Sequence, residues 1–145
     1  MASIFSRRFL HIATALFLVW SAAAASAVLA GAAAEDPKTI LDRIYSVKQA
    51  ERGESLFKRS CTGCHAATDF AGGMLASHWE GGNVADIYDI IANYMPANDP
   101  GSLKPQDAAD IVAFFLHMDG YPVGYDDLPG DSAVLAKIGI VPNPK

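Results

Sequence analysis

Apolar and small residues recur every three or four positions in three stretches of the chain, and segments rich in glycine and proline separate these stretches. The first stretch follows Ser46, which has the character of an N-cap, with Gln49 in the capping-box position three residues later. The positions that share one helical face are Ala50, Gly53, Phe57 and Ser60. The pattern predicts a helix from Ser46 to Cys61, in which Gly53 lets another helix approach closely.

The second stretch begins at Asn83, a good N-cap, and Asp86 adds a negative charge in its first turn. Its apolar stripe comprises Val84, Ile87, Tyr88, Ile91 and Tyr94. Pro96 ends this predicted helix directly after Met95, because the residue before a proline is pushed out of helical geometry. The turn-rich residues 96–104 that follow are predicted to form a loop.

The third stretch starts at Pro105, which suits the first position of a helix, and Asp107 lies in its first turn. Lys104 stands where a capping Ser or Thr would be expected. The helix is predicted to end at Gly120. Its broad apolar face comprises Ala108, Ile111, Val112, Phe114, Phe115 and Met118.

The remaining segments carry no such periodicity. Residues 66–82 contain two glycine pairs and are predicted to be loop. Residues 35–46 form a short polar N-terminal extension, and residues 121–145 are predicted to wrap over the surface, with a short helix at 132–137. Because no segment alternates polar and apolar residues with the period of a strand, we expect an all-α domain at residues 47–120, built from three main helices.

Residues 1–34 have the three parts of a secretory signal. Arg7 and Arg8 precede a long apolar run without charged side chains, and small residues close it before Glu35. We therefore predict a signal peptide that is cleaved near residue 34, or earlier after Ala25, and export to the periplasm. The alternative is an uncleaved anchor, because the run is long enough to span a bilayer, and only then would the membrane be a partner.

The charge balance narrows the choice of partners. The chain of 145 residues has a formal net charge of −5 at pH 7. Removal of residues 1–34 takes away two arginines and no acid, which leaves 9 basic and 16 acidic side chains and a net charge of −7. An acidic surface repels nucleic acid, so we exclude that class of partner. It favours a protein with a basic patch, approached through electrostatic steering.

The pentapeptide CTGCH, which follows the first predicted helix, contains both cysteines of the chain. At this spacing Cys61 and Cys64 can each form a thioether to a haem vinyl group, which leaves His65 beneath the iron. A redox dithiol would need a βαβ context, which the all-α pattern does not provide. Half a zinc site would need two further ligands, and His78 and His117 stand at no recognised spacing for them. We therefore expect one covalently attached haem c per chain.

The distal iron ligand has several candidates, namely Met74, His78, Met95, His117 and Met118. Met95 is preferred because it lies 30 residues beyond His65, which gives the chain room to cross from one haem face to the other. Pro96 also restricts the backbone next to it. The plain alternative is a core methionine at a helix end. If His65 and Met95 both bind, the iron has no open position, and the protein is an electron carrier rather than an enzyme.

Three aromatic residues, Trp79, Tyr88 and Tyr94, are further candidates for the haem environment. Trp79 lies in a glycine-rich segment, where it could pack on the haem or donate a hydrogen bond to a propionate. An ordinary core position is an equally good interpretation of Trp79. For Tyr88 and Tyr94, the core interpretation is the better one.

The ordered combination of a Gly53-x-x-x-Phe57 helix, CTGCH, a Met95-Pro96 loop and a final DIVAFFL helix resembles class I cytochrome c. The resemblance covers residues 47–120. In that family a glycine and an aromatic residue of the first helix pack against a hydrophobic and an aromatic residue of the last helix. The matching positions here are Gly53, Phe57, Ile111 and Phe114. The resemblance implies the class I cytochrome c fold around one covalent haem.

One feature of that family is missing here. Many members have a proline soon after the haem-binding pentapeptide, and its carbonyl accepts a hydrogen bond from the proximal histidine. No proline lies between His65 and Met95. We therefore expect another carbonyl, near residues 71–73, to orient the imidazole of His65.

The stretches YMPANDPGSL and PQDAADIVAFFLHMDGYP are similar to periplasmic cytochromes associated with quinoprotein (PQQ-dependent) dehydrogenases. This narrower resemblance implies a dehydrogenase as electron donor and an oxidase or another cytochrome as acceptor. Two alternatives stay open. One is an open-site haem protein, a peroxidase or gas binder, in which Met95 only packs. The other is a cytochrome subunit tightly bound within a larger oxidoreductase.

Overall fold

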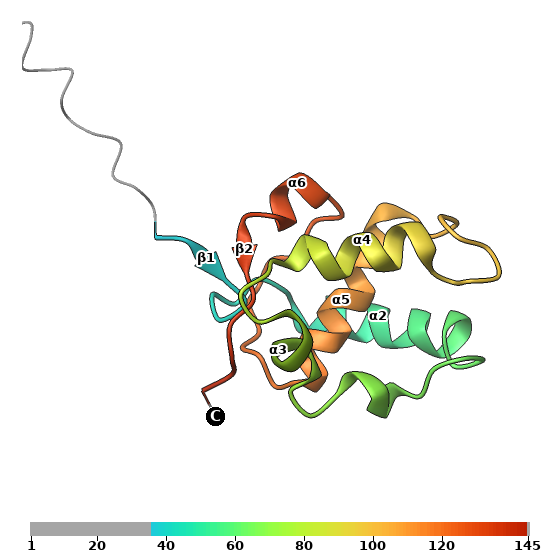
Figure 1. The fold of residues 1–145 in the computed structure, drawn as a ribbon, viewed down its shortest axis with the longest axis horizontal. Coiled ribbons are helices and arrows are strands. Elements are labelled where there is room, and N and C mark those ends of the chain that lie inside the picture. The colour runs from blue at the N-terminus through green and yellow to red at the C-terminus, as the bar shows by residue number, and fades with distance from the viewer. Residues whose placement is uncertain (1–35, 145) are drawn as a thin grey trace, which may run out of the picture. The chain divides into compact units, whose positions relative to one another are not determined.

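A computed structural model describes residues 36–144, so the predicted signal at residues 1–34 lies outside the described part of the chain. The described residues form five helices, one 3-10 turn and two very short strands (Figure 1). In order they are β1 (Lys38–Thr39), α2 (Val47–Ser60), η1 (Ala67–Phe70), α3 (Met74–Trp79), α4 (Val84–Tyr94), α5 (Pro105–Met118), α6 (Ser132–Leu135) and β2 (Ile138–Gly139). This architecture confirms the predicted all-α class. Within residues 36–144 no helix combines the length and the hydrophobicity that a membrane crossing requires.

The crossing of α2 and α5 is the centre of the fold, and it depends on Gly53. A Cβ atom at Gly53 would lie 1.8 Å from the carbonyl oxygen of Asp110 and 3.0 Å from the Cβ of Phe114. The predicted close approach of a second helix is therefore confirmed. One turn further along α2, the ring of Phe57 is 1% exposed and packs against Phe114 at a centroid distance of 5.6 Å.

The start of α2 differs in one respect from the predicted capping box. The Ser46 hydroxyl accepts a hydrogen bond from the Gln49 backbone N–H at 3.1 Å, as an N-cap does. The Gln49 side chain, which is fully buried, does not complete the box. It donates to Asp110 at 3.0 Å and accepts from the Leu128 N–H at 2.6 Å, because it faces α5 and the C-terminal segment. At the other end of α2, Ser60 is exposed rather than part of the buried face.

Helices α4 and α5 begin where the caps predict. The Asn83 side chain accepts from the Ala85 N–H at 3.0 Å, and the Asp86 carboxylate accepts from the Asn83 N–H at 2.8 Å. Pro105 is the first residue of α5, and no side chain caps that helix. The predicted stripe of α4 is wrong at its last position, because Tyr94 is 65% exposed on the final turn.

The segment 66–82, predicted to be loop, contains η1 and α3. Positive φ angles at Gly72 and Gly73 turn the chain into α3. The carboxylate of Asp119, at the end of α5, then accepts hydrogen bonds from the N–H groups of Gly73 at 2.9 Å and Leu75 at 3.1 Å. A partner 44 or more residues away therefore holds the start of this short helix, which local periodicity does not reveal.

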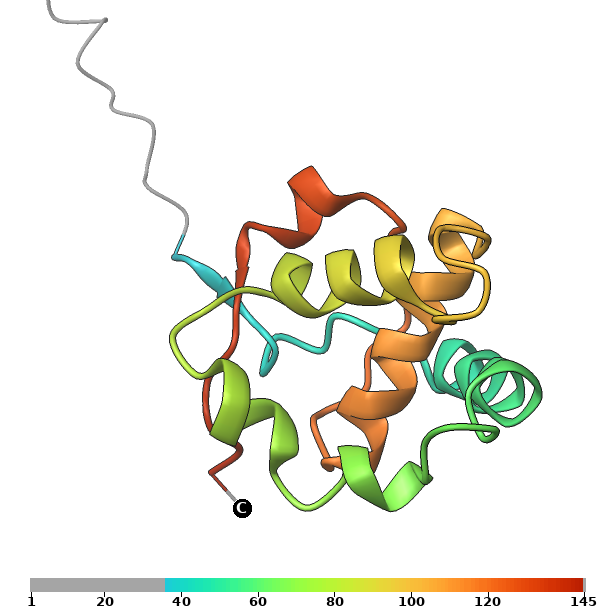
Figure 2. The ribbon, with the colours of Figure 1, turned by 45° about the vertical axis from the view of Figure 1, so that its right-hand side comes forward.

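Both ends of the described chain contribute to the core. Strand β1 pairs with β2 in parallel, and the C-terminal segment runs past the start of α4, where α6 packs (Figure 2). The surface character predicted for residues 121–145 does not hold at Leu128 and Leu135, which are 0% exposed. The same is true of Ile40 and Tyr45 in the extension predicted to be polar. The Tyr45 hydroxyl donates to the Tyr121 carbonyl at 2.7 Å, which joins the two segments.

Candidate haem site

A cavity of about 580 Å³ opens beside the crossing of α2 and α5. Its walls come from the end of α2, the CTGCH turn, η1, α3, α4, the loop at residues 95–98 and α5. No Asp, Glu, Lys or Arg side chain lines the cavity, and most of the lining side chains are apolar. The volume lies within the range of about 300–1,000 Å³ that is usual for cofactor pockets.

The CTGCH turn continues directly from α2. The N–H of Cys61 donates to the carbonyl of Phe57 at 2.9 Å, and the N–H groups of Cys64 and His65 both donate to the carbonyl of Cys61, at 3.0 and 2.9 Å. This tight turn places both thiols and the imidazole on the cavity wall. The two thiols are not joined in a disulfide. Cys64 is exposed, whereas Cys61 is partly buried, and burial raises the pKa of its thiol.

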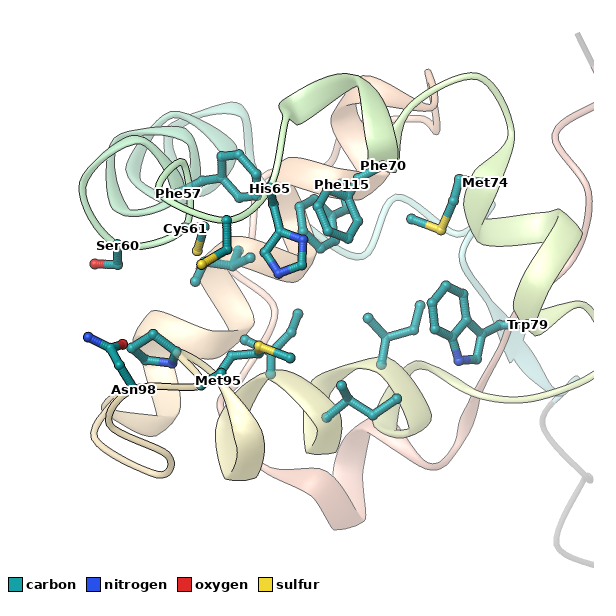
Figure 3. A pocket seen from close by; sticks show the side chains of 18 residues that line it. Phe57, Ser60, Cys61, His65, Phe70, Met74, Trp79, Met95, Asn98 and Phe115 are labelled. Atoms are coloured by element: carbon teal, nitrogen blue, oxygen red, sulfur yellow. The ribbon is translucent and has the colours of Figure 1, made fainter.

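His65 and Met95 enter the cavity from opposite walls (Figure 3). Met95 follows the last turn of α4 in an extended conformation, and its N–H donates to the Ile91 carbonyl at 3.2 Å. The helix end thus directs the thioether into the space that the imidazole faces. This placement would allow two axial ligands on a metal held between them.

Of the other candidates for the distal ligand, Met74 lines the cavity, whereas the remaining three do not. Met74 lines the same cavity from the first position of α3, but it lies on the same side as His65 and toward the end away from Cys61 (Figure 3). His78 is exposed, with its Nδ1 within 3.1 Å of the Met74 carbonyl oxygen, and it does not line the cavity. His117 packs edge-on against Tyr45 and also lies outside it, as does Met118.

Trp79, the last residue of α3, lines the end of the cavity that is far from Cys61 (Figure 3). It is partly buried, with its indole ring directed toward the cavity. The structure therefore brings Trp79 together with Cys61, Cys64, His65 and Met95, the site residues predicted from the sequence.

Several wall residues could not be found from the sequence. Phe70, in η1, lies 5.4 Å from the His65 ring between centroids, at an interplanar angle of 64°. Ser60 and Asn98 provide polar groups at the open end near Cys61 (Figure 3). None of these belongs to a motif, and the only available signal is their short sequence distance from the pentapeptide or from Met95.

The residues present fit a covalently attached haem. The cavity is large and apolar, two unpaired thiols and an imidazole share one wall, and a thioether faces them. Thioether bonds to the two haem vinyl groups need two reduced thiols at this spacing, and an axial ligand set needs donors on both faces of the ring. Zinc fits poorly, because the described residues contain no group of three or more His, Cys, Asp or Glu side chains that could hold a metal ion.

Comparison with protein families agrees with this geometry. Residues 48–115 match the family model described as cytochrome C oxidase, cbb3-type, subunit III. Neither the curated proteins nor the solved structures give a match to the chain. The family match supports a c-type cytochrome, and together with the helical structure it gives a class I cytochrome c fold. It also implies a covalently attached haem c, for which Cys61 and Cys64 have the required spacing.

The matched cytochrome c domain indicates haem binding, electron transfer and redox partners in general, and it fits a carrier rather than an enzyme. Domains of this type are typically exported. The family match covers α2 to most of α5, which includes every residue of the candidate site.

Proposed function

We propose that this protein is a periplasmic single-haem electron carrier. Cys61 and Cys64 hold the haem through thioethers, His65 is the proximal iron ligand and Met95 is the distal one. The observation that carries the proposal is the placement of His65 and Met95 on opposite walls of one apolar cavity, with both thiols beside the histidine (Figure 3).

The side chains of the cavity have distinct tasks in this proposal. A bound haem supplies a one-electron couple between ferric and ferrous iron. His65 and Met95 would both hold the iron, which would leave no position where a substrate could bind the metal. The Met95 thioether favours the ferrous state, and the apolar walls from α4 and α5 exclude water, which raises the reduction potential further.

Electrons would pass at the open end of the cavity. Cys64, Ala97 and Asn98 are exposed there, so a partner can approach the edge of the ring that the thiols hold. Trp79 lines the far end, where its indole N–H would serve a propionate. We propose a dehydrogenase as donor, of the quinoprotein type that the segment after Tyr94 resembles, and an oxidase or another cytochrome as acceptor.

The test compares two methionines that line the same cavity. In the oxidised protein, Met95→Ala should abolish the weak far-red absorption band of methionine bound to ferric iron. Met74→Ala removes a similar volume from the same cavity and should leave the band in place. Loss of the band in Met74→Ala, or its survival in Met95→Ala, would reject Met95 as the ligand.

A second candidate is a cytochrome that stays bound within a larger oxidoreductase. It is favoured by the matched family model, whose description names a subunit of an oxidase. The chemistry of the haem site would be the same in both candidates. They differ in whether the protein diffuses freely or stays bound to other subunits. Size-exclusion chromatography of the natively expressed protein separates the two, because a free carrier elutes at the size of a monomer and a subunit elutes with its partners.

A further inference from the structure

We infer that Phe70 is a positioning residue, which sets the orientation of the His65 imidazole through an edge-to-face ring contact. The inference rests on the proposed function, in which His65 binds the iron. It concerns what determines the plane of the imidazole about the iron–nitrogen axis, a property that neither the motif nor the ligand set specifies.

The contact between the two rings has the geometry of a specific aromatic pair. Their centroids are 5.4 Å apart and their planes meet at 64°. Aromatic pairs favour such tilted, edge-to-face arrangements at about 4.5–7 Å, because the positive edge of one ring meets the negative face of the other. Rotation of the imidazole would break this contact, so the contact opposes rotation.

Two buried aromatic rings also contact Phe70. Its ring stacks on Phe115 of α5 at 4.4 Å, with an interplanar angle of 5°, and meets Phe57 of α2 edge-on at 5.6 Å. Phe115 and Phe57 are 4% and 1% exposed. The crossing of α2 and α5 therefore fixes the ring of Phe70, and the fixed ring restricts the orientation of the His65 imidazole.

The local backbone also supports this arrangement. The Asp69 carboxylate accepts a hydrogen bond from the Ala66 N–H at 2.9 Å, which closes the 3-10 turn between His65 and Phe70. With this turn closed, the chain brings the Phe70 ring into edge contact with the histidine that precedes the turn.

Hydrogen bonding, the usual means of orienting a metal-bound imidazole, is not seen at this position. Among residues 36–144, the His65 ring forms no hydrogen bond. Within residues 71–73, where a carbonyl is expected to orient the ring, the Gly73 carbonyl accepts from the Ser77 N–H at 3.0 Å instead. Ring packing is therefore the contact that remains to fix the imidazole plane.

The experiment uses the haem-loaded, oxidised protein and three variants. Phe70→Leu removes the ring but keeps an apolar side chain, and Phe70→Tyr keeps the ring. Phe114→Leu is the matched control, because Phe114 belongs to the same aromatic cluster, packs on Phe57 and Phe115, and has no ring contact with His65. The readouts are the paramagnetic proton shifts of the haem methyl groups and the electron paramagnetic resonance g-values, which depend on the orientation of the axial imidazole.

We expect Phe70→Leu to change the pattern of methyl shifts and the g-values, while Phe70→Tyr and Phe114→Leu keep the pattern of the unaltered protein. An unchanged pattern in Phe70→Leu, or an equal change in Phe114→Leu, overturns the inference. If Phe70→Leu yields no haem protein, the unaltered reduced protein decides. Nuclear Overhauser contacts between the ring protons of His65 and Phe70 are then expected, and their absence overturns the inference.

The same spectra separate this inference from the proposed function. Iron-shifted resonances of the His65 ring in the unaltered protein establish that His65 is a ligand. If those resonances are absent, the proposed ligation fails and the role of Phe70 fails with it. If they are present and Phe70→Leu has no effect, the ligation stands and only the role of Phe70 is rejected.

Discussion

Two regions of the molecule are stabilised in opposite ways. The first, here called the polar latch, consists of Gln49, Arg52, Gln106, Asp110, Asp127 and the backbone of Leu128. Asp110 is 3% exposed and accepts hydrogen bonds from both glutamines and from Arg52, the last at 2.8 and 3.1 Å. Arg52 also binds Asp127 at 2.6 Å. The latch joins α2, α5 and the C-terminal segment with protein groups alone.

The second region, here called the haem wall, comprises residues 61–79 and 95–98. It consists of one turn, two short helical segments and a loop, and its apolar side chains surround the cavity of about 580 Å³. Much of the packing of these side chains must come from the cofactor, because a covalent haem fills the space that they face. The comparison teaches that protein contacts alone stabilise the helix crossing, whereas the packing of the site also depends on the haem.

Preventing haem attachment should have the largest effect on stability. It should destabilise the haem wall more than the polar latch. With Cys61→Ala and Cys64→Ala combined, the haem wall loses its packing partner, and a small domain without that part of its core is marginal. We expect the thermal midpoint to fall further than in any other variant described here. In this variant, hydrogen exchange should show that the remaining protected amides lie mainly in α2 and α5. Protection that is equal in the wall and in the latch would contradict the comparison.

Asp110→Ala tests the latch from the other side. It removes the buried acceptor of four hydrogen bonds from three side chains. Because Arg52 is 46% exposed and can be solvated, we expect a loss of about 2 kcal/mol in the free energy of unfolding. The haem absorption spectrum should not change. As a control, Asp127→Ala removes a carboxylate that is 43% exposed and should cost less than about 1 kcal/mol. Denaturant titrations of both variants provide the measurement.

Asp119→Ala should weaken the haem wall locally. The Asp119 carboxylate accepts from the N–H groups of Gly73 and Leu75, and loss of a helix-capping acceptor of this kind costs about 1 kcal/mol. Amide exchange should accelerate within α3 and stay unchanged in α2. If exchange in the two helices rises together, α3 is not the independently weak segment described here.

The smallest expected effect concerns pH and the latch. The hydrogen bond from the Ser46 hydroxyl, and then that from Arg52, lower the pKa of Asp127 below its ordinary value. A carboxyl whose folded pKa is lowered stabilises the fold fully above its unfolded pKa of about 3.9, and this contribution is lost as pH falls through the folded pKa. Unfolding titrations from about pH 6 to about pH 3 should show a shallower acid-side decline in Asp127→Asn. An identical decline in both proteins would show that Asp127 does not contribute to the loss of stability at low pH.

The three long helices could be predicted from the sequence because their signals are local. Ser46, Asn83 and Pro105 mark helix starts within a few residues of the apolar stripes that they introduce. The pentapeptide and the helix-end position of Met95 likewise indicate the residues that line the cavity. Each of these features can be recognised from a residue and its near neighbours in the sequence.

The rest depends on contacts between distant residues. Helix α3 is held by Asp119, and Phe70 is held by rings of α2 and α5, so no short window of sequence contains both partners. The buried side chains of the C-terminal segment, such as Leu128, have no periodic pattern. They lie in the core beside contacts with distant residues, such as the hydrogen bond from the Leu128 N–H to Gln49.

The most direct test of the proposed carrier is the addition of carbon monoxide to the reduced, haem-loaded protein. Carbon monoxide binds ferrous iron only where an axial position is open or its ligand is displaced. If His65 and Met95 both bind, the absorption spectrum should stay unchanged, and Met95→Ala should make it responsive to the gas. A spectrum that shifts in the unaltered protein would show an axial position that is open or held by a displaceable ligand. That result would contradict stable ligation by both His65 and Met95, and it would favour ligand binding or catalysis over electron transfer.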